Sequence, residues 1–232
     1  MHGSEPHERL LVALAEQLKL PLLQIARGAE LVTMDGSTRT HQSIAQTADV
    51  ALRLIDGYLL SIAPTQTELS LEPISVSALL QDTAHRLEQL AKRYDCKLEI
   101  SLSGKYGPVM ANRQNLEAAF TMLGYSLIEA QPSEQHPTVL LAAHKSAAGL
   151  VAGIFGSQEG LTSDMFRRAR ALYGSARQPL TSTTTASSAG IFIADSLMQS
   201  MAAPLHLARH HRFTGLAATL LPSRQLHFVG VA

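Results

Sequence analysis

Tryptophan is absent from the sequence, and cysteine occurs once, at Cys96. A single cysteine excludes an internal disulfide framework and a zinc centre built from several cysteines, and it is typical of a protein in a reducing compartment. Aromatic residues make up only 5% of the chain, whereas hydrophobic residues make up 46%. We therefore expect a core built mainly from aliphatic side chains.

Excess charge of either sign is also missing, because 19 basic residues balance 19 acidic ones. Nucleic-acid-binding domains carry a basic surface, so we expect no nucleic-acid partner. No apolar run approaches the roughly 20 residues of a membrane span, and the first residues lack the pattern of a signal peptide. These absences predict a cytoplasmic location and no membrane span in this chain.

The first part of the chain predicts two amphipathic helices, over residues 7–34 and 40–62, joined by a polar turn. Pro21 lies within the first pattern and is expected to kink that helix. Two helices joined by a short turn form an antiparallel hairpin, and a lone hairpin leaves apolar surface exposed, so a four-helix bundle in a homodimer is expected. The stripe predicted to be buried on the second helix consists of Ile44, Ala48, Ala51, Ile55, Leu59 and Ile62.

Beyond a proline-bounded linker at 63–73, helical and strand patterns are mixed. The expected elements are strands in 70–76, 97–104, 107–111, 138–147 and 149–157, helices at 77–95, 112–131, 163–174 and 190–202, a Ser/Thr-rich loop at 175–190, and a hairpin at 204–222. Ser77 and Asn112 are the expected N-caps. The pattern predicts an α+β sandwich with one mixed sheet and helices on one face. The expected domains are 1–65 and 66–232.

This order of elements, together with the stretch "EQLKLPL" at 16–22, resembles the transmitter region of sensor histidine kinases. That region consists of a dimerisation and phosphotransfer hairpin followed by a Bergerat-type ATP-binding domain. The resemblance covers about residues 8–222. It implies a helical hairpin that forms a four-helix bundle in a dimer, followed by a Bergerat-type α/β sandwich.

The phospho-acceptor box is altered at its reactive positions. Leu18, Lys19 and Pro21 fit the family pattern, but Glu16 stands at the acceptor histidine position and Gln17 at the position of the general base. A carboxylate does not replace imidazole here, because the transfer needs a nitrogen nucleophile and a neighbouring base. The resemblance therefore implies a phosphotransfer box without its nucleophile.

The nucleotide-binding motifs are altered in the same way. By register, Ser126 stands where a helical asparagine would hold Mg²⁺, and Gly156 stands where an aspartate would bind the adenine amino group. Of the two glycine boxes, Gly160 and Gly190 remain. The resemblance identifies these four residues as a remnant pocket. Losing the aspartate removes a charge-assisted hydrogen bond, which contributes about 1.5–3 kcal/mol.

These residues predict a dimeric regulatory module of a two-component system that has lost its phospho-acceptor and ATP-binding groups. Its expected partners are a response-regulator receiver domain or a histidine kinase, bound around Glu16 and Lys19. No cofactor is expected. Two alternatives remain: a divergent but active histidine kinase that binds ATP and Mg²⁺, and a histidine phosphotransferase. No metal site is expected, because the pair His206 and His210 lacks a third ligand nearby.

Overall fold

In this computed structural model, the described residues are 69–102, 104–130, 137–156 and 185–223, together with separate positions in the first 60 residues. Those positions are 18, 21–25, 27–29, 31, 41, 44, 47–48, 51–52 and 55–60, and all of them are helical. We call them the N-terminal helical segment. The predicted helix 163–174, most of the linker and most of the turn between the first two helices lie outside the described residues. The antiparallel hairpin therefore stays a prediction.

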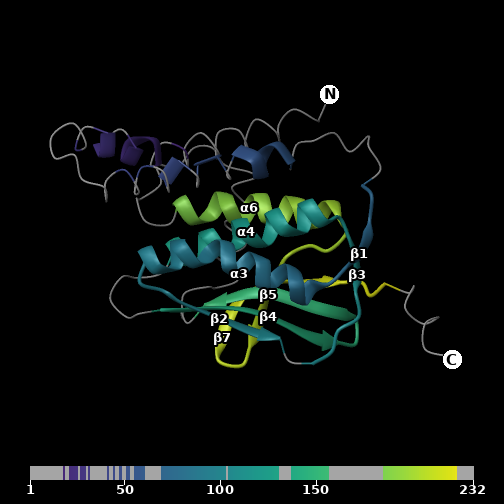
Figure 1. Ribbon diagram of the computed structural model, residues 1–232. Coiled ribbons are helices and arrows are strands. Elements are labelled where there is room, and N and C mark those ends of the chain that lie inside the picture. The colour runs from purple at the N-terminus through teal and green to yellow at the C-terminus, as the bar shows by residue number, and fades with distance from the viewer. Residues whose placement is uncertain are drawn as a thin grey trace.

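Three helices lie on one face of a twisted sheet (Figure 1). The helices are α3 (Val76–Arg93), α4 (Arg113–Glu129) and α6 (Thr185–Ser200). The strands are β1 (Glu72–Ile74), β2 (Lys97–Leu102), β3 (Val109–Ala111), β4 (Thr138–Ser146), β5 (Gly149–Gly156), β6 (His206–His210) and β7 (Phe213–Leu220). The predicted α+β sandwich, with helices on one face, is confirmed.

The main sheet has five strands in the order β2-β4-β5-β7-β6. β2 is parallel to β4, and the other neighbours are antiparallel, so the sheet is mixed as predicted. β1 and β3 do not join this sheet but pair with each other in a separate two-stranded ribbon. The expectation of one sheet was wrong in this respect.

One of the two expected helix caps is confirmed. The Asn112 side chain accepts a hydrogen bond from the backbone N–H of Asn115 at 3.0 Å. At α3 the N-cap is Ser75 rather than Ser77, and the Ser75 hydroxyl accepts from the N–H of Ala78 at 3.4 Å. The helix begins earlier because Val76 is buried in the core, where it forms the first residue of the apolar face.

The helix α6 begins at Thr185, five residues before the predicted start at Gly190. The composition of 185–189 predicted a loop, because serine and threonine favour turns. Helix propensity is a weak preference, however, and tertiary packing overrides it. In this chain α6 lies along α4 in the helix layer, which supports the additional turn (Figure 1).

The main core lies between the sheet and the three helices and is mostly aliphatic, as the composition predicted. Its largest fully buried side chains are Phe120, Ile74, Leu80, Leu87, Leu116, Leu123, Leu127, Ile128, Leu141, Ile154 and Ile193. Phe155 is also fully buried but belongs to a second, smaller cluster on the opposite face of the sheet. Glycine permits close helix packing at Gly124, where an added Cβ would collide with the side chain of Leu87. No helix within the described residues is long and apolar enough to cross a bilayer.

The N-terminal helical segment packs directly on the helix layer. Tyr58 is buried and belongs to the main core. A Cβ added to Gly57 would lie 3.2 Å from Cγ2 of Ile193 on α6 and 3.4 Å from Met122 on α4. The Arg93 guanidinium at the end of α3 donates to the hydroxyl of Thr47 at 3.2 Å. The segment and the sandwich therefore share a continuous apolar contact.

Candidate functional site

Two of the four predicted remnant-pocket residues lie in direct contact. Ser126 on α4 is buried, and Gly190 on α6 faces it so closely that an added Cβ would overlap the Ser126 hydroxyl oxygen. The same Cβ would lie 3.2 Å from the backbone oxygen of Met122. At this point the position expected to hold Mg²⁺ contacts another helix, and its side chain is shielded from solvent.

Gly156 is the last residue of β5 and is buried. It pairs with Val139 on β4 and with Thr214 on β7. Glycine offers no side chain, so the position where an adenine-binding carboxylate is expected carries no charge. Gly160 lies outside the described residues.

Asp195 is a buried carboxylate that the sequence reasoning did not select. It lies on α6, and its Oδ1 accepts from the backbone N–H of Leu205 at 3.0 Å, while its Oδ2 accepts from Nε2 of Gln199 at 2.7 Å. Oδ1 therefore binds the connection from α6 to β6, and Oδ2 binds a side chain one turn further along α6. A single acid within the apolar run "GIFIADSLM" was the available signal.

The expected partner-binding residues Glu16 and Lys19, and Gln17 beside them, lie outside the described residues. Their neighbour Leu18 is half-buried and packs against the main core. Leu22 and Leu23, one turn further on, are exposed.

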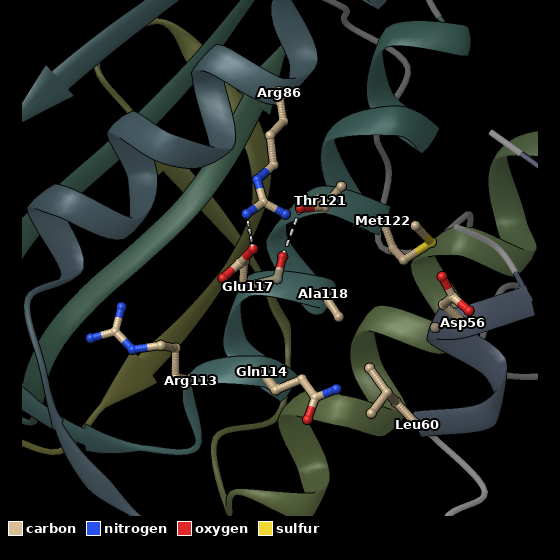
Figure 2. A pocket seen from close by; sticks show the side chains of 10 residues that line it. Asp56, Leu60, Arg86, Arg113, Gln114, Glu117, Ala118, Thr121 and Met122 are labelled. Carbon is tan, nitrogen blue, oxygen red and sulfur yellow. Dashed lines mark hydrogen bonds and ion pairs between the residues drawn. The ribbon is translucent and has the colours of Figure 1, made fainter. Parts of the chain in front are cut away.

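A cavity of about 340 Å³ opens where the N-terminal helical segment meets α3 and α4. Figure 2 shows Asp56 and Leu60 on the N-terminal segment facing Ala118 and Met122 on α4 across this cavity. The residues that line it are Asp56, Gly57, Leu60, Arg86, Arg113, Gln114, Glu117, Ala118, Thr121 and Met122. Its volume lies at the lower end of the range of small-molecule sites, which often occur between domains.

Three of the charged residues that line this cavity, Arg86, Arg113 and Glu117, form ion pairs. The Arg86 guanidinium forms an ion pair with Glu117, and Nε of Arg113 lies 3.1 Å from Oε1 of Glu72 (Figure 2 shows the first pair). The hydroxyl of Thr121 donates to the backbone oxygen of Glu117 at 2.8 Å. The cavity therefore has an apolar floor and a rim whose charges balance, and no excess charge selects an ionic ligand.

No protein-family model matches the chain, and no curated protein matches its sequence. Solved structures do match in fold, and those reported below are of histidine kinases and a phosphotransferase. Three of these structures match 88% or more of this chain, which includes the N-terminal region as well as the sandwich.

The chain is similar to the histidine kinase AdeS from Acinetobacter baumannii, with a TM-score of 0.58, 12% identity, and coverage of 88% of this chain and 96% of that one. It is similar to full-length ShkA in complex with AMPPNP, with a TM-score of 0.56, 15% identity, and coverage of 93% and 46%. It is also similar to a bacterial phosphotransferase, with a TM-score of 0.54, 10% identity, and coverage of 94% and 97%.

These similarities establish the fold. The chain resembles the transmitter region of histidine kinases, and its mixed sheet with three helices on one face corresponds in fold to a solved histidine kinase catalytic domain. At these identities the fold is shared, but the chemistry of the site has to be judged from the residues themselves.

Proposed function

We propose that this chain is a histidine-kinase-like signalling module that acts by binding a partner and transfers no phosphate. The observation that carries the proposal is the contact between Ser126 and Gly190. The family pattern places a metal-binding asparagine at position 126 and a phosphate-binding glycine loop around position 190. In this chain, α4 and α6 are in contact there through the Ser126 hydroxyl and Gly190.

The chemistry of the remaining groups supports this reading. Mg²⁺ prefers several carboxylate, carbonyl or water oxygens in octahedral geometry, and one shielded serine hydroxyl is a poor substitute. Gly156 provides no acceptor for the adenine amino group. Glu16 at the acceptor position has no nitrogen nucleophile.

The expected partner is the receiver domain of a response regulator, with a histidine kinase as the alternative partner. The helix face that carries Glu16 and Lys19 in the sequence pattern is the proposed contact. Homodimer formation through the N-terminal helices fits the solvent-exposed leucines of that segment, which are Leu22, Leu23, Leu31, Leu52 and Leu59. Where such side chains join into one apolar patch, the patch marks an interaction site.

The first test is calorimetry of the full chain with AMPPNP and Mg²⁺. We expect no binding heat up to millimolar nucleotide. Binding at micromolar concentration would contradict the proposal and favour the divergent, ATP-binding kinase. A titration with purified receiver domains should give saturable binding that a Glu16→Ala/Lys19→Ala double variant weakens, because both side chains lie on the proposed contact face.

A second candidate function is phosphotransfer. The likeness to a bacterial phosphotransferase over nearly the whole of both chains favours it. This function requires a displaced acceptor, for which His7 and His41 are the candidates in the N-terminal region. Incubation with a phosphorylated receiver domain, followed by detection of acid-labile phosphate on the chain, distinguishes the two functions. Label on a histidine would establish phosphotransfer.

A further inference from the structure

The sheet carries a second apolar cluster on its back face, which we define as the face opposite α3, α4 and α6. Strand alternation places every second residue there. The cluster consists of Leu140, Ala142, Val151, Phe155, Phe213 and Ala217. This face has no helix over it among the described residues, so another element has to shield these side chains from water.

The curl of the sheet itself supplies that cover, because the sheet bends at two glycines and brings its edge strands β2 and β6 toward each other. A Cβ added to Gly153 would lie 2.6 Å from the Cβ of Ala217, its partner on β7, and a Cβ added to Gly215 would collide with the backbone of β5. The absence of these two side chains permits the back face to become concave. In Figure 1 the turn between β6 and β7 lies on the side of the sheet away from the helices.

The curled sheet is closed by a contact between its two edge strands. Nε2 of His210 on β6 lies 3.2 Å from the hydroxyl of Ser101 on β2, although these strands are at opposite edges of the sheet. His210 is 8% exposed. This one hydrogen bond joins the two edges across the back face.

Three imidazoles meet at the same place. The ring centroid of His210 lies 5.5 Å from that of His144 on β4 and 4.6 Å from that of His211 in the turn. Phe155 covers the other side of His210 at 5.5 Å. Nδ1 of His144 is buried and has no hydrogen-bond partner among the described residues, so no acceptor there stabilises an N–H formed by protonation of that nitrogen.

The surroundings contain no carboxylate paired with this cluster among the described residues. On β2 the nearest acid on the same face is Glu99, whose carboxylate is 2.7 Å from Nζ of Lys97. On β5 and β7 the neighbours are apolar, and in the turn the Arg212 guanidinium lies over the Phe213 ring at 5.1 Å. On β6 the other histidine on this face, His206, is exposed. The charged group next to this cluster in the sequence, Arg212, is therefore positive, and the acid on this face of β2, Glu99, is paired with Lys97.

We propose that His144, His210 and His211 form an acid-sensitive latch that holds the edge strand β6 against the edge strand β2 across the back face of the sheet and releases it on protonation. Protonating His210 places a cation between two other imidazoles and near Arg212, within a largely apolar site. The closed arrangement requires a neutral ring. Opening lets that ring reach water and exposes the apolar cluster.

The electrostatics agree with this direction. Burial lowers the pKa of His210, and the neighbouring His211 and His144 lower it further. The closed state therefore binds the proton less tightly than the open state, in which the pKa of histidine is about 6.5. The latch is fully closed above that pH and weakens as the pH falls through and below it.

Hydrogen exchange of the full chain at about pH 7.5 and pH 5.5, corrected for intrinsic rates, tests the latch. Because each pKa unit corresponds to a tenfold change, protection of the β6 amides should fall by up to about tenfold at the lower pH. Protection in α4 and in β4–β5 should change by less than about twofold, since opening is local. Dye binding to the exposed apolar cluster should rise in parallel.

The matched variants are His210→Gln and His206→Gln. Glutamine at 210 retains a hydrogen-bonding side chain but does not titrate, so the pH dependence of β6 protection should disappear. His206 is exposed on the same strand and face, so His206→Gln should behave as the parent does. A His210→Gln variant that keeps the full pH dependence would overturn the proposal.

If the His210→Gln protein is open at every pH, its lack of pH dependence does not test the latch. A measurement on the parent protein avoids this problem. In an NMR titration of the parent protein, the His210 ring should titrate below the ordinary histidine pKa of about 6.5. A midpoint at or above that value, or β6 protection that does not change with pH, would show that the cluster is not a latch.

Discussion

At the scale of single residues, the contact between α4 and α6 depends on glycine at position 190. Gly190→Ala places a methyl group against the Ser126 hydroxyl and near the backbone oxygen of Met122. We expect it to lower the free energy of unfolding by about 1–3 kcal/mol through overpacking. This cost exceeds the roughly 1 kcal/mol by which alanine is otherwise favoured over glycine in a helix. Urea unfolding measures the difference.

The control for this substitution is Gly107→Ala, because no atom lies within 4 Å of a Cβ added there. Its effect should stay within about 0.5 kcal/mol. Adding Ser126→Ala to Gly190→Ala should recover part of the loss, since it removes the colliding oxygen. A Gly190→Ala protein more stable than the parent would mean that the helices are not in contact at this point.

Glu129, near the end of α4, makes stability depend on pH in the opposite direction to His210. Burial raises the pKa of Glu129 to about 7, although the charge of nearby Arg93 lowers it. The folded state therefore binds the proton more tightly than the unfolded state, where the pKa of glutamate is about 4.3. This contribution to stability is present at low pH and is lost as the pH rises to about 7.

Glu129→Gln mimics the protonated carboxyl group. It should raise the free energy of unfolding by about 1–3 kcal/mol at pH 8 and change it little at pH 4. Denaturant unfolding at the two pH values checks this. An equal effect at both would show that ionisation of Glu129 is not the cause.

The residues also show what the sequence could predict. The N-cap Asn112 followed from local chemistry alone and is confirmed. Ser75 was missed in favour of Ser77, because two serines flank the first buried residue of the helix and only packing distinguishes them. The motif positions given to Ser126, Gly156 and Gly190 stay a prediction, and the close contact at Gly190 depends on how near two helices lie, which no local pattern encodes.

At the scale of elements, Asp195 holds the end of α6 to the start of β6. Asp195→Ala removes the carboxylate oxygen that accepts from the buried N–H of Leu205. Losing a buried hydrogen bond to a charged group costs about 1–3 kcal/mol. We expect the free energy of unfolding to fall by this amount and hydrogen exchange of the Leu205 amide to become faster.

Gln199→Ala is the comparison, because it removes only the second partner of Asp195 and leaves the Leu205 hydrogen bond in place. It should cost less than Asp195→Ala and leave exchange at Leu205 almost unchanged. Equal effects of the two substitutions would show that the connection does not depend on the backbone contact.

The elements themselves were largely predictable, since helix and strand periods differ and the turns carry glycine or proline. The curl of the sheet was not. It depends on Gly153 and Gly215 lying beside neighbouring strands whose register no single segment encodes. The contact between His210 and Ser101 joins residues 109 positions apart and could not be read from local patterns.

At the scale of the whole molecule, the N-terminal helical segment has two apolar sides. One side carries Tyr58 into the main core. The other carries Leu52 and Leu59, which are 59% and 53% exposed and, being seven residues apart, lie on one face of a helix. Leu59 belonged to the stripe predicted to be buried, and within one chain it is not. A second copy of this chain is the proposed cover.

Light scattering coupled to size exclusion tests that proposal. The parent chain should have twice the mass of one chain, and Leu52→Glu/Leu59→Glu should have the mass of one, because charge at the centre of an apolar interface is strongly disfavoured. Leu221→Glu is the matched control, since Leu221 is 64% exposed but lies on the sandwich. A dimer that survives the first change and is lost with the second would move the interface from the N-terminal helices to the sandwich.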